Sequence, residues 1–153
     1  MRIGQGWDIH PLEAGRPLWI GGVEISADRG AVGDSDADVL LHAAMDALLG
    51  AAGLGDLGVV FPAGTVAPGT PSRDLWREVW RRVTGAGWRV VNFDATVVLE
   101  APRLGPHRAA IEASLGELLG SYEVSIKFKG ADGLGPVGER HAVMASAVVL
   151  LKD

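Results

Sequence analysis

The sequence predicts an α/β protein, an α+β sandwich with helices packed on one side of a mixed β-sheet. Segments rich in β-branched residues alternate with three segments whose apolar residues recur at helical spacing. The last apolar run, Ala142 to Leu151, has the composition of a strand that is covered on both faces. At 153 residues, 48% of them hydrophobic, the chain fits one domain over residues 1–153. Such a domain buries roughly 70% of the surface that its unfolded chain exposes.

Two strand segments open the chain, and the first helix follows them. Arg2 to His10 is the first expected strand, and Leu18 to Ile25 is a short hairpin turned at Gly21-Gly22. A helix is expected from about Ala37 to Ala51, because its leucines and Met45 lie at helical spacing. Ser35 or Asp36 is placed to cap it.

The middle of the chain contains a loop and a second helix. Pro62 to Ser72 consists largely of Pro, Gly, Thr and Ala, which bury little surface, so a mobile loop is expected. Ser72 is the candidate cap of a helix that ends near Gly85 and Gly87.

Strands flank the third helix. Trp88 to Leu99 is a long β-branched run, and Tyr122 to Lys129 alternates apolar and polar residues as a half-buried strand does. The helix between them begins at Pro106, a favoured first-turn residue, and its apolar positions continue to Leu119.

The composition excludes several classes of protein. With 14 Lys and Arg against 19 Asp and Glu, the chain is not a strongly basic nucleic-acid binder. Its longest apolar stretch is far too short to span a bilayer, and its N-terminus lacks the apolar core of a signal peptide. We therefore expect a cytoplasmic protein without membrane or nucleic-acid partners. Because cysteine is absent, a bound metal must be held by His, Asp or Glu.

A carboxylate and two imidazoles form the first candidate site. Asp8 and His10 lie two residues apart in an expected strand, so both side chains point to the same face. The first helix would bring His42 to them if it packs against the end of that strand. Three N and O ligands with an open fourth position are typical of a catalytic zinc. The alternative is that Asp8 caps a turn and His42 is a core histidine.

An acidic segment precedes the first helix. Asp34, Asp36 and Asp38 place three carboxylates beside Ser35. Helix capping explains part of this pattern, and the excess favours either a bound polyol or support for the metal ligands. Asp38 and Asp46 share a helix face with the histidine, either as acceptors for the imidazoles or as solvated charges.

Two later segments are candidate anion sites. Lys127 to Gly135 places two lysines beside a glycine-rich strand end, and Glu100 to His107 brings Arg103 to the start of a helix. Both segments also have the composition of ordinary turns that leave a sheet, and the residues alone leave this choice open.

Taken together, these segments resemble the 2-C-methyl-D-erythritol 2,4-cyclodiphosphate synthase family of the non-mevalonate isoprenoid pathway. The likeness covers essentially the whole chain. The motifs that carry it are Arg2–His10, Ile20–Val23, Ser35–Ala43, Asp46–Gly50, Leu54–Gly58, Phe61-Pro62, Ala101–Leu104 and Leu134-Gly135.

The resemblance implies an enzyme that catalyses intramolecular phosphoryl transfer. In this family the substrate is 4-diphosphocytidyl-2-C-methyl-D-erythritol 2-phosphate. Its 2-phosphate attacks the β-phosphorus, CMP leaves, and the 2,4-cyclodiphosphate results. The resemblance further implies a zinc- and magnesium-dependent phosphorus–oxygen lyase, with Zn²⁺ on Asp8, His10 and His42 and with Mg²⁺ or Mn²⁺ at Asp132 and the diphosphate.

The resemblance also implies a homotrimer whose sheets face the centre and whose active sites lie between subunits. Asp34, Ser35 and Gly130 occupy the family's catalytic positions. Leu99 to Gly105 and Lys129 to Asp132 would come from the adjacent subunit. The implied substrate-binding residues are Asp56, Leu57, Gly58, Phe61, Pro62, Thr65, Leu99, Ala101, Pro102, Arg103, Leu104, Gly105, Lys129 and Ala131.

The chain departs from the family pattern within the implied substrate pocket. Asp34 stands where the family has a His credited with supporting the transition state, and Gly130 stands where it has Thr. The family's Phe-Pro-Asp-Thr-Asp is replaced by Phe61-Pro62-Ala63-Gly64-Thr65, so Ala63 and Thr65 stand in for two carboxylates. The alternative function is therefore that of a trimeric zinc-binding paralogue that acts on, or only binds, a different CDP-linked or phosphorylated ligand.

Overall fold

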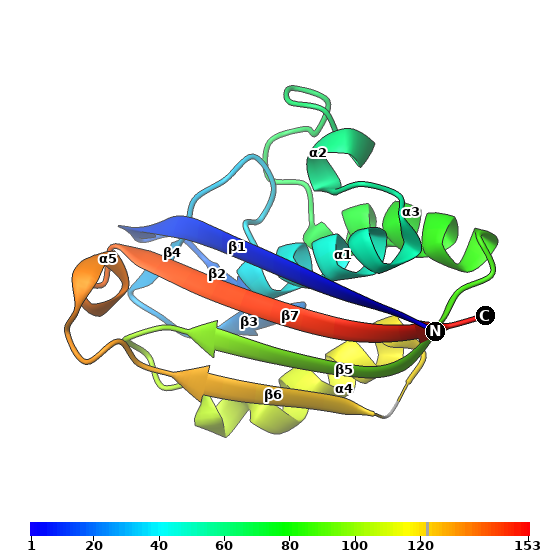
Figure 1. Ribbon diagram of the computed structural model, residues 1–153. Helices are drawn as coiled ribbons and strands as arrows, with labels where there is room; N and C mark the ends of the chain where they lie inside the picture. Colours follow the sequence, from blue (N-terminus) through cyan, green and yellow to red (C-terminus); the bar gives the residue numbers. More distant parts are fainter. Residues whose placement is uncertain (122) are drawn as a thin grey trace.

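Five strands form one mixed sheet, as the sequence predicts (Figure 1). Their order is β4-β1-β7-β5-β6, with β5 and β6 parallel and the other neighbours antiparallel. This computed structural model describes residues 1–121 and 123–153, so Tyr122 of the last-but-one predicted strand lies outside it. The strands of this sheet are β1 (Arg2–Ala14), β4 (Arg29–Ala31), β5 (Arg89–Val98), β6 (Val124–Lys129) and β7 (Ala142–Lys152).

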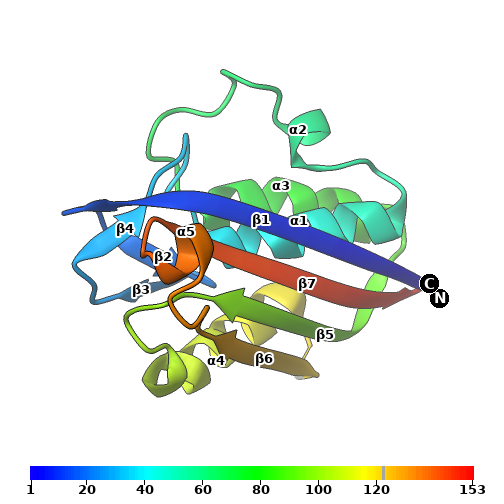
Figure 2. The ribbon, with the colours of Figure 1, turned by 60° about the vertical axis from the view of Figure 1, so that its left-hand side comes forward.

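The three long helices lie on one side of this sheet, which confirms the predicted layering (Figure 1, Figure 2). Helix α1 packs against the central strands β1 and β7. The three helices are α1 (Val39–Ala52), α3 (Ser72–Gly85) and α4 (Arg108–Leu119), and Pro106 lies in a 3₁₀ turn, Gly105–His107, just before α4. Two further single-turn helices, α2 (Leu57–Val60) and α5 (Gly135–Gly138), were not predicted. Within the described residues no helix combines the length and apolar character needed to cross a membrane.

The predicted glycine hairpin is confirmed. Strands β2 (Leu18–Ile20) and β3 (Val23–Ile25) pair antiparallel on either side of Gly21 and Gly22. Both glycines have positive φ, 63° and 79°, which the two-residue turn requires and side chains disfavour.

The helix starts differ from those predicted. Helix α1 begins at Val39, because Ala37 has φ 56° and cannot belong to a right-handed helix. Its cap is Asp38, whose carboxylate accepts the Leu41 N–H at 3.0 Å, so the expectation of a Ser35 or Asp36 cap is wrong. Ser72 is likewise not the cap of α3, since it is the first helical residue and Pro71 precedes it.

Two glycines bring β1 close to α1. A Cβ at Gly6 would lie 1.9 Å from the Ala43 carbonyl oxygen, and one at Gly4 would lie 2.0 Å from that of Ala47. Only residues without side chains fit at these two positions. Asp8 and His10 follow at the same alternation along β1, so they too point toward the helix layer.

The opposite face of the sheet is apolar and uncovered in the single chain. Ile3 is 73% exposed and Trp7 is 51% exposed on β1, and Val148 is exposed on β7. The expectation that the last strand is covered on both faces is therefore not met within one chain, where only its inward residues, such as Val143 and Val149, are buried.

Candidate metal centre

One carboxylate and two imidazoles meet where β1 passes α1. Asp8 Oδ2 lies 2.8 Å from His10 Nε2 and 3.1 Å from His42 Nδ1. The two imidazole nitrogens are 3.0 Å apart. Within the described part of the chain these three residues are the group whose ligand atoms are close enough to hold one metal ion, all within 4.8 Å of one another. The turn-cap and core-histidine interpretation is wrong, since Asp8 lies inside a strand and His42 faces the cluster.

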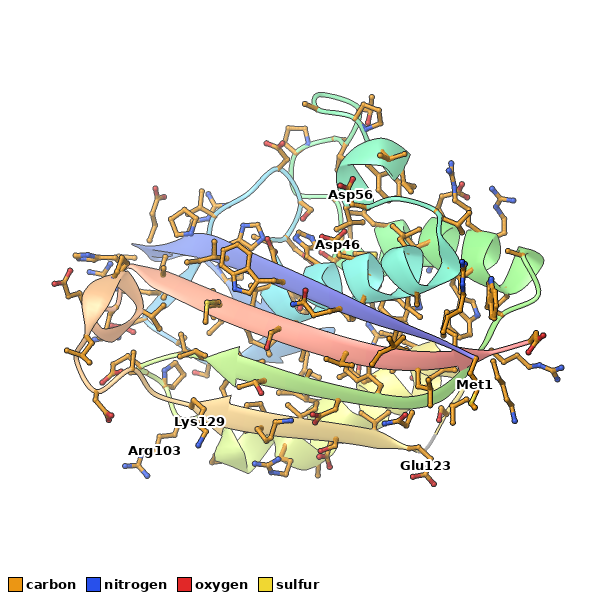
Figure 3. All side chains as sticks on the ribbon, viewed as in Figure 1. Met1, Asp46, Asp56, Arg103, Glu123 and Lys129 are labelled. Carbon is orange, nitrogen blue, oxygen red and sulfur yellow. The ribbon has the colours of Figure 1, made fainter. Side chains whose placement is uncertain are left out.

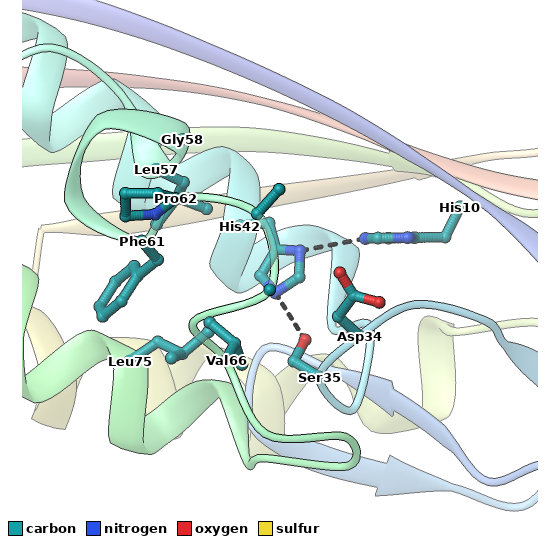
Figure 4. A pocket seen from close by; sticks show the side chains of 12 residues that line it. His10, Asp34, Ser35, His42, Leu57, Gly58, Phe61, Pro62, Val66 and Leu75 are labelled. Atoms are coloured by element: carbon teal, nitrogen blue, oxygen red, sulfur yellow. Dashed lines mark hydrogen bonds between the residues drawn. The ribbon is translucent and has the colours of Figure 1, made fainter.

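The far nitrogen of each imidazole has its own partner. His10 Nδ1 is 3.1 Å from the Val32 carbonyl oxygen. A carbonyl oxygen only accepts, so Nδ1 carries a proton, and the lone pair of the neutral ring is then on Nε2, the nitrogen that can bind a metal ion. His42 Nε2 lies 3.1 Å from Ser35 Oγ and 3.0 Å from Ser72 Oγ. Figure 4 shows the His42 contacts with His10 and Ser35.

The close pairing shifts the pKa of Asp8 and that of His10. Burial raises the pKa of Asp8, but hydrogen bonds and charge from His10 and His42 outweigh it and lower the pKa from 3.8 to about 2. Burial lowers the pKa of His10, but the hydrogen bond and charge of Asp8 outweigh it and raise the pKa above 6.5. Both shifts have one origin, because the Asp8 carboxylate lies 2.8 Å and 3.1 Å from the two imidazole nitrogens and its negative charge stabilises a positive charge placed between them.

The donor set fits a divalent metal. Two imidazole nitrogens and one carboxylate oxygen are ligands that zinc prefers, and three of them leave a fourth position for water or substrate. All three side chains are partly exposed, so an incoming ligand can reach this position.

A cavity of about 210 Å³ opens beside this cluster (Figure 4). Its polar wall is formed by His10, Asp34, Ser35 and His42. The rest of the wall is apolar and comes from α2, the following loop and α3. Those lining residues are Leu57, Gly58, Phe61, Pro62, Ala63, Gly64, Val66 and Leu75. The cavity is thus polar only on its metal-site side.

Several predicted site residues meet at this cavity and others do not. Ser35 and Asp34 line it, as do Leu57, Gly58 and the Phe61-Pro62 pair. Asp56 lies just outside, where its carboxylate caps α2 by accepting the Val59 N–H at 2.9 Å. Thr65 also lies outside, and its hydroxyl donates to the Pro62 carbonyl oxygen at 2.6 Å.

Asp38 and Asp46 do not accept from the imidazoles. Asp38 is fully buried and accepts the backbone N–H groups of Gly21 at 2.8 Å and Gly22 at 2.6 Å, besides that of Leu41. Asp46 accepts the Leu57 N–H at 2.8 Å. Both interpretations made from sequence are therefore wrong: these carboxylates tie loops to α1, and they are neither partners of the histidines nor simply solvated.

The second group of predicted residues lies at the ends of β5 and β6, away from the cavity. The Leu99 N–H donates to the Lys129 carbonyl oxygen at 2.9 Å, and the Ala131 N–H donates to Glu100 Oε2 at 2.8 Å, so the two segments are adjacent. Figure 3 shows Arg103 and Lys129 at the β6 edge of the sheet, whereas Asp46 and Asp56 lie beyond β1 at the opposite edge. None of the residues 99–105 or 129–132 lines the cavity.

The burial of these residues limits how they can contact a ligand. Leu99 and Leu104 are buried in the core, so only their backbone is available. Gly130 and Asp132 are exposed in the turn after β6, and Arg103 is exposed after β5.

Ser72 and Asp36 add polar contacts to the cluster. The sequence predicts Asp36 as a helix cap or as part of an acidic segment that binds a polyol or supports the metal ligands, and it predicts Ser72 only as a cap. In the structure Ser72 lies beside His42 and hydrogen bonds to Asp36. No local pattern signals this contact, because it joins residues 36 positions apart.

Fold and site define a small α/β protein with a carboxylate–imidazole cluster, able to hold a metal ion, at the edge of a cavity. The chain matches the YgbB family over residues 1–152 and belongs to that family. It is 52% identical over 153 residues to the 2-C-methyl-D-erythritol 2,4-cyclodiphosphate synthase of Bordetella avium (strain 197N). The aligned region covers 98% of this chain and 94% of that relative.

Solved structures agree with this assignment. A 2C-methyl-D-erythritol-2,4-cyclodiphosphate synthase matches with a TM-score of 0.90 and 42% identity, over 99% of this chain and 100% of the other. A structure described as the CDP-bound form of such a synthase matches with a TM-score of 0.90 and 40% identity, over the same shares of the two chains. The family resemblance expected from the motifs is confirmed.

Proposed function

We propose that the chain converts 4-diphosphocytidyl-2-C-methyl-D-erythritol 2-phosphate to the 2,4-cyclodiphosphate with release of CMP. The observation that carries the proposal is the Asp8, His10 and His42 cluster, which opens into a cavity large enough for a small polyol. The names of the relatives and the CDP in one similar structure support the same substrate class.

The cluster would hold zinc, and Asp132 would hold a Mg²⁺ or Mn²⁺ ion bound with the diphosphate. When bound, zinc supplies a Lewis acid that neutralises charge on a phosphate oxygen. The attacking phosphate oxygen is already an anion, so no side chain has to remove a proton from the nucleophile. What the chain's own residues contribute is positioning and charge compensation.

Ser35 is the hydroxyl placed to bind substrate beside the metal centre. Its Oγ accepts the Ala37 N–H at 3.1 Å, and its side chain lines the cavity. Leu57, Phe61 and Pro62 form the apolar wall that would exclude water from the methylerythritol carbons. Asp56 is exposed and precedes the lining residue Leu57, and its carboxylate would accept from a substrate hydroxyl.

We further propose that each active site is completed by a neighbouring subunit of a homotrimer. The Leu99–Gly105 and Lys129–Asp132 segments lie together but away from the cavity of their own chain. The exposed apolar sheet face, with Ile3 and Trp7, supplies a surface that association would cover. Sheets that face one another at the centre would place the cytidine-binding segments of one chain beside the metal centre of the next.

Asp34 and Gly130 set the level of activity in this proposal. Asp34 is an exposed carboxylate on the cavity wall, so it adds negative charge next to an anionic substrate. Gly130 presents no hydroxyl to the diphosphate. We expect Asp34→His and Gly130→Thr each to raise turnover by about tenfold or more, the size of effect seen when one transition-state donor is removed or restored. The matched control is Asp74→His on the exposed face of α3, which should leave turnover unchanged.

The direct experiment follows the reaction by phosphorus NMR, with zinc-loaded protein, Mg²⁺ and the CDP-linked 2-phosphate substrate. Appearance of the cyclic diphosphate together with CMP supports the proposal. The apolar substitutions Ala63 and Gly64 on the cavity wall favour one alternative, a zinc-binding paralogue with a different CDP-linked or phosphorylated ligand. Tight binding of CDP without product would establish that alternative, provided that neither Asp34→His nor Gly130→Thr raises turnover.

A further inference from the structure

A buried polar chain runs from Asp36 through Ser72 to His42. Ser72 is fully buried, and its Oγ lies 3.0 Å from His42 Nε2. The same hydroxyl hydrogen bonds to Asp36 Oδ1, and the Ser72 N–H donates to Asp36 Oδ2 at 3.0 Å. Both oxygens of the carboxylate thus hold the first residue of α3 against the metal centre.

The direction of the hydrogen bonds along this chain follows from proton counting. A carboxylate only accepts, so the single hydroxyl proton of Ser72 is donated to Asp36. The Ser72 oxygen then has only lone pairs left for His42, and it must accept the Nε2 proton. A neutral imidazole protonated at Nε2 presents its lone pair at Nδ1, the atom that lies 3.1 Å from Asp8 and 3.0 Å from His10.

Ser35 alone would not decide this orientation. Its hydroxyl lies 3.1 Å from His42 Nε2 but makes no hydrogen bond to a carboxylate, so it can donate or accept. If it donated, His42 would carry its proton at Nδ1 and turn an N–H toward the cluster, which would block metal binding there. The Asp8 carboxylate, 3.1 Å from Nδ1, also favours a proton at that atom in the metal-free protein. The Asp36–Ser72 pair opposes this by requiring a proton at Nε2.

We infer that Asp36 and Ser72 are positioning residues that fix the tautomer and ring orientation of His42 as a metal ligand. The inference deepens the proposed function and rests on its metal centre. The Val32 carbonyl does the same for His10, so each imidazole ligand is oriented by its own outer partner. Such partners typically change metal affinity by about 10- to 100-fold when they are removed.

The backbone around Asp36 is held by further contacts. The Asp36 N–H donates to the Thr70 carbonyl oxygen at 3.0 Å, and the Asp38 N–H donates to Asp36 Oδ1 at 3.1 Å. The acidic segment and the loop before α3 are thereby joined on either side of the carboxylate. This connection assigns a role to an acidic residue that capping does not explain.

The test compares Ser72→Ala with Ser72→Thr, which keeps the hydroxyl. The first readout is the pair of ¹⁵N shifts of the His42 ring in metal-free protein, at a pH where both imidazoles are neutral. Wild type and Ser72→Thr should show the Nε2–H tautomer, whereas Ser72→Ala should shift toward the Nδ1–H tautomer, because Asp8 still accepts from Nδ1. The second readout is zinc affinity by chelator competition, which should fall about 10- to 100-fold in Ser72→Ala and recover in Ser72→Thr.

The matched control is Ser114→Ala, which removes another buried serine hydroxyl, one that donates to the Gly21 carbonyl oxygen and accepts from Arg73 but contacts no histidine. It should change stability without changing the His42 tautomer or zinc affinity. An unchanged tautomer and unchanged zinc affinity in folded Ser72→Ala would overturn the inference. Wild type that shows the Nε2–H tautomer yet binds no zinc would instead overturn the proposed metal centre, so the two failures are distinguishable.

Discussion

Asp38 shows how one side chain can organise a site without touching it. Its fully buried carboxylate caps α1 and accepts the N–H groups of both turn glycines of the β2-β3 hairpin. The hairpin and the helix that carries His42 are therefore held by the same two oxygens. Burial raises the pKa of Asp38, while the three N–H donors oppose that rise and keep the buried group satisfied.

We expect Asp38→Ala to lower the free energy of unfolding by about 3 kcal/mol, because it removes a helix cap and leaves buried N–H groups unpaired. Urea unfolding measures this loss. Asp56→Ala is the matched control, since Asp56 is also a cap but is exposed and serves only the four-residue α2. Its loss should remain below about 1 kcal/mol. Equal losses in the two variants would show that the buried network around Asp38 adds nothing.

Asp46 gives a pH-dependent prediction at the same scale. Burial raises its pKa above 3.8, and the charges of Asp56 and Asp8 raise it further, whereas the Leu57 N–H opposes the shift. The ionised form is therefore disfavoured in the folded protein. The cost is absent below pH 3.8, where both states are protonated, and grows as the pH rises through the folded pKa.

Asp46→Asn keeps an oxygen for the Leu57 N–H and removes this charge. In metal-free protein the variant should melt above wild type at about pH 7, and the difference should vanish at about pH 3. Thermal unfolding at the two pH values measures it. A variant that is less stable than wild type at neutral pH would contradict the assigned direction.

At the scale of the element, the approach of α1 to β1 is what brings the metal ligands together. Gly6→Ala would place a Cβ 1.9 Å from the carbonyl oxygen of Ala43, which is the residue next to His42. We expect a loss of about 1–3 kcal/mol from overpacking. Zinc binding should also weaken, because the helix must move away from Asp8. Chemical unfolding and zinc titration measure the two effects.

The control for this change is Gly50→Ala in the same helix, where an added Cβ would meet nothing within 4 Å. It should raise the free energy of unfolding by up to about 1 kcal/mol, since alanine is the better helix former, and leave zinc binding intact. Zinc affinity that is unchanged in a destabilised Gly6→Ala protein would show that the site does not depend on this close packing.

The same elements show what the sequence can and cannot predict. Alternation placed Asp8 and His10 on one strand face, and helical spacing placed His42 on a helix face, so local periodicity named the candidate metal ligands. That the three meet depends on how α1 packs against β1, which periodicity does not give. The exact start of α1 did not follow, because it depends on the left-handed Ala37 and on a hairpin that lies earlier in the chain. The contact between Ser72 and His42 could not be predicted either, since a serine before a helix is ordinarily interpreted as a cap.

At the scale of the whole molecule, the uncovered sheet face and the divided site point to the same assembly. Ile3, Trp7 and Val148 present apolar side chains on one face, a surface that a lone chain would leave in water. The Arg103 and Lys129 segments are out of reach of the cavity in their own chain. In the proposed trimer the assembly that covers this face also completes the site, so loss of association should abolish turnover without removing the metal.

Trp7→Glu tests this link, because it places a charge in the middle of the apolar face while the metal ligands stay in place. Light scattering should give three times the 16.0 kDa chain mass for wild type and a single chain mass for the variant. The variant should bind zinc with wild-type affinity and form no cyclic diphosphate. Val59→Glu, an exposed apolar residue on α2 away from the sheet, should keep the trimer mass. A wild-type protein that turns over substrate as a monomer would refute the shared site, because the cavity of one chain would then suffice.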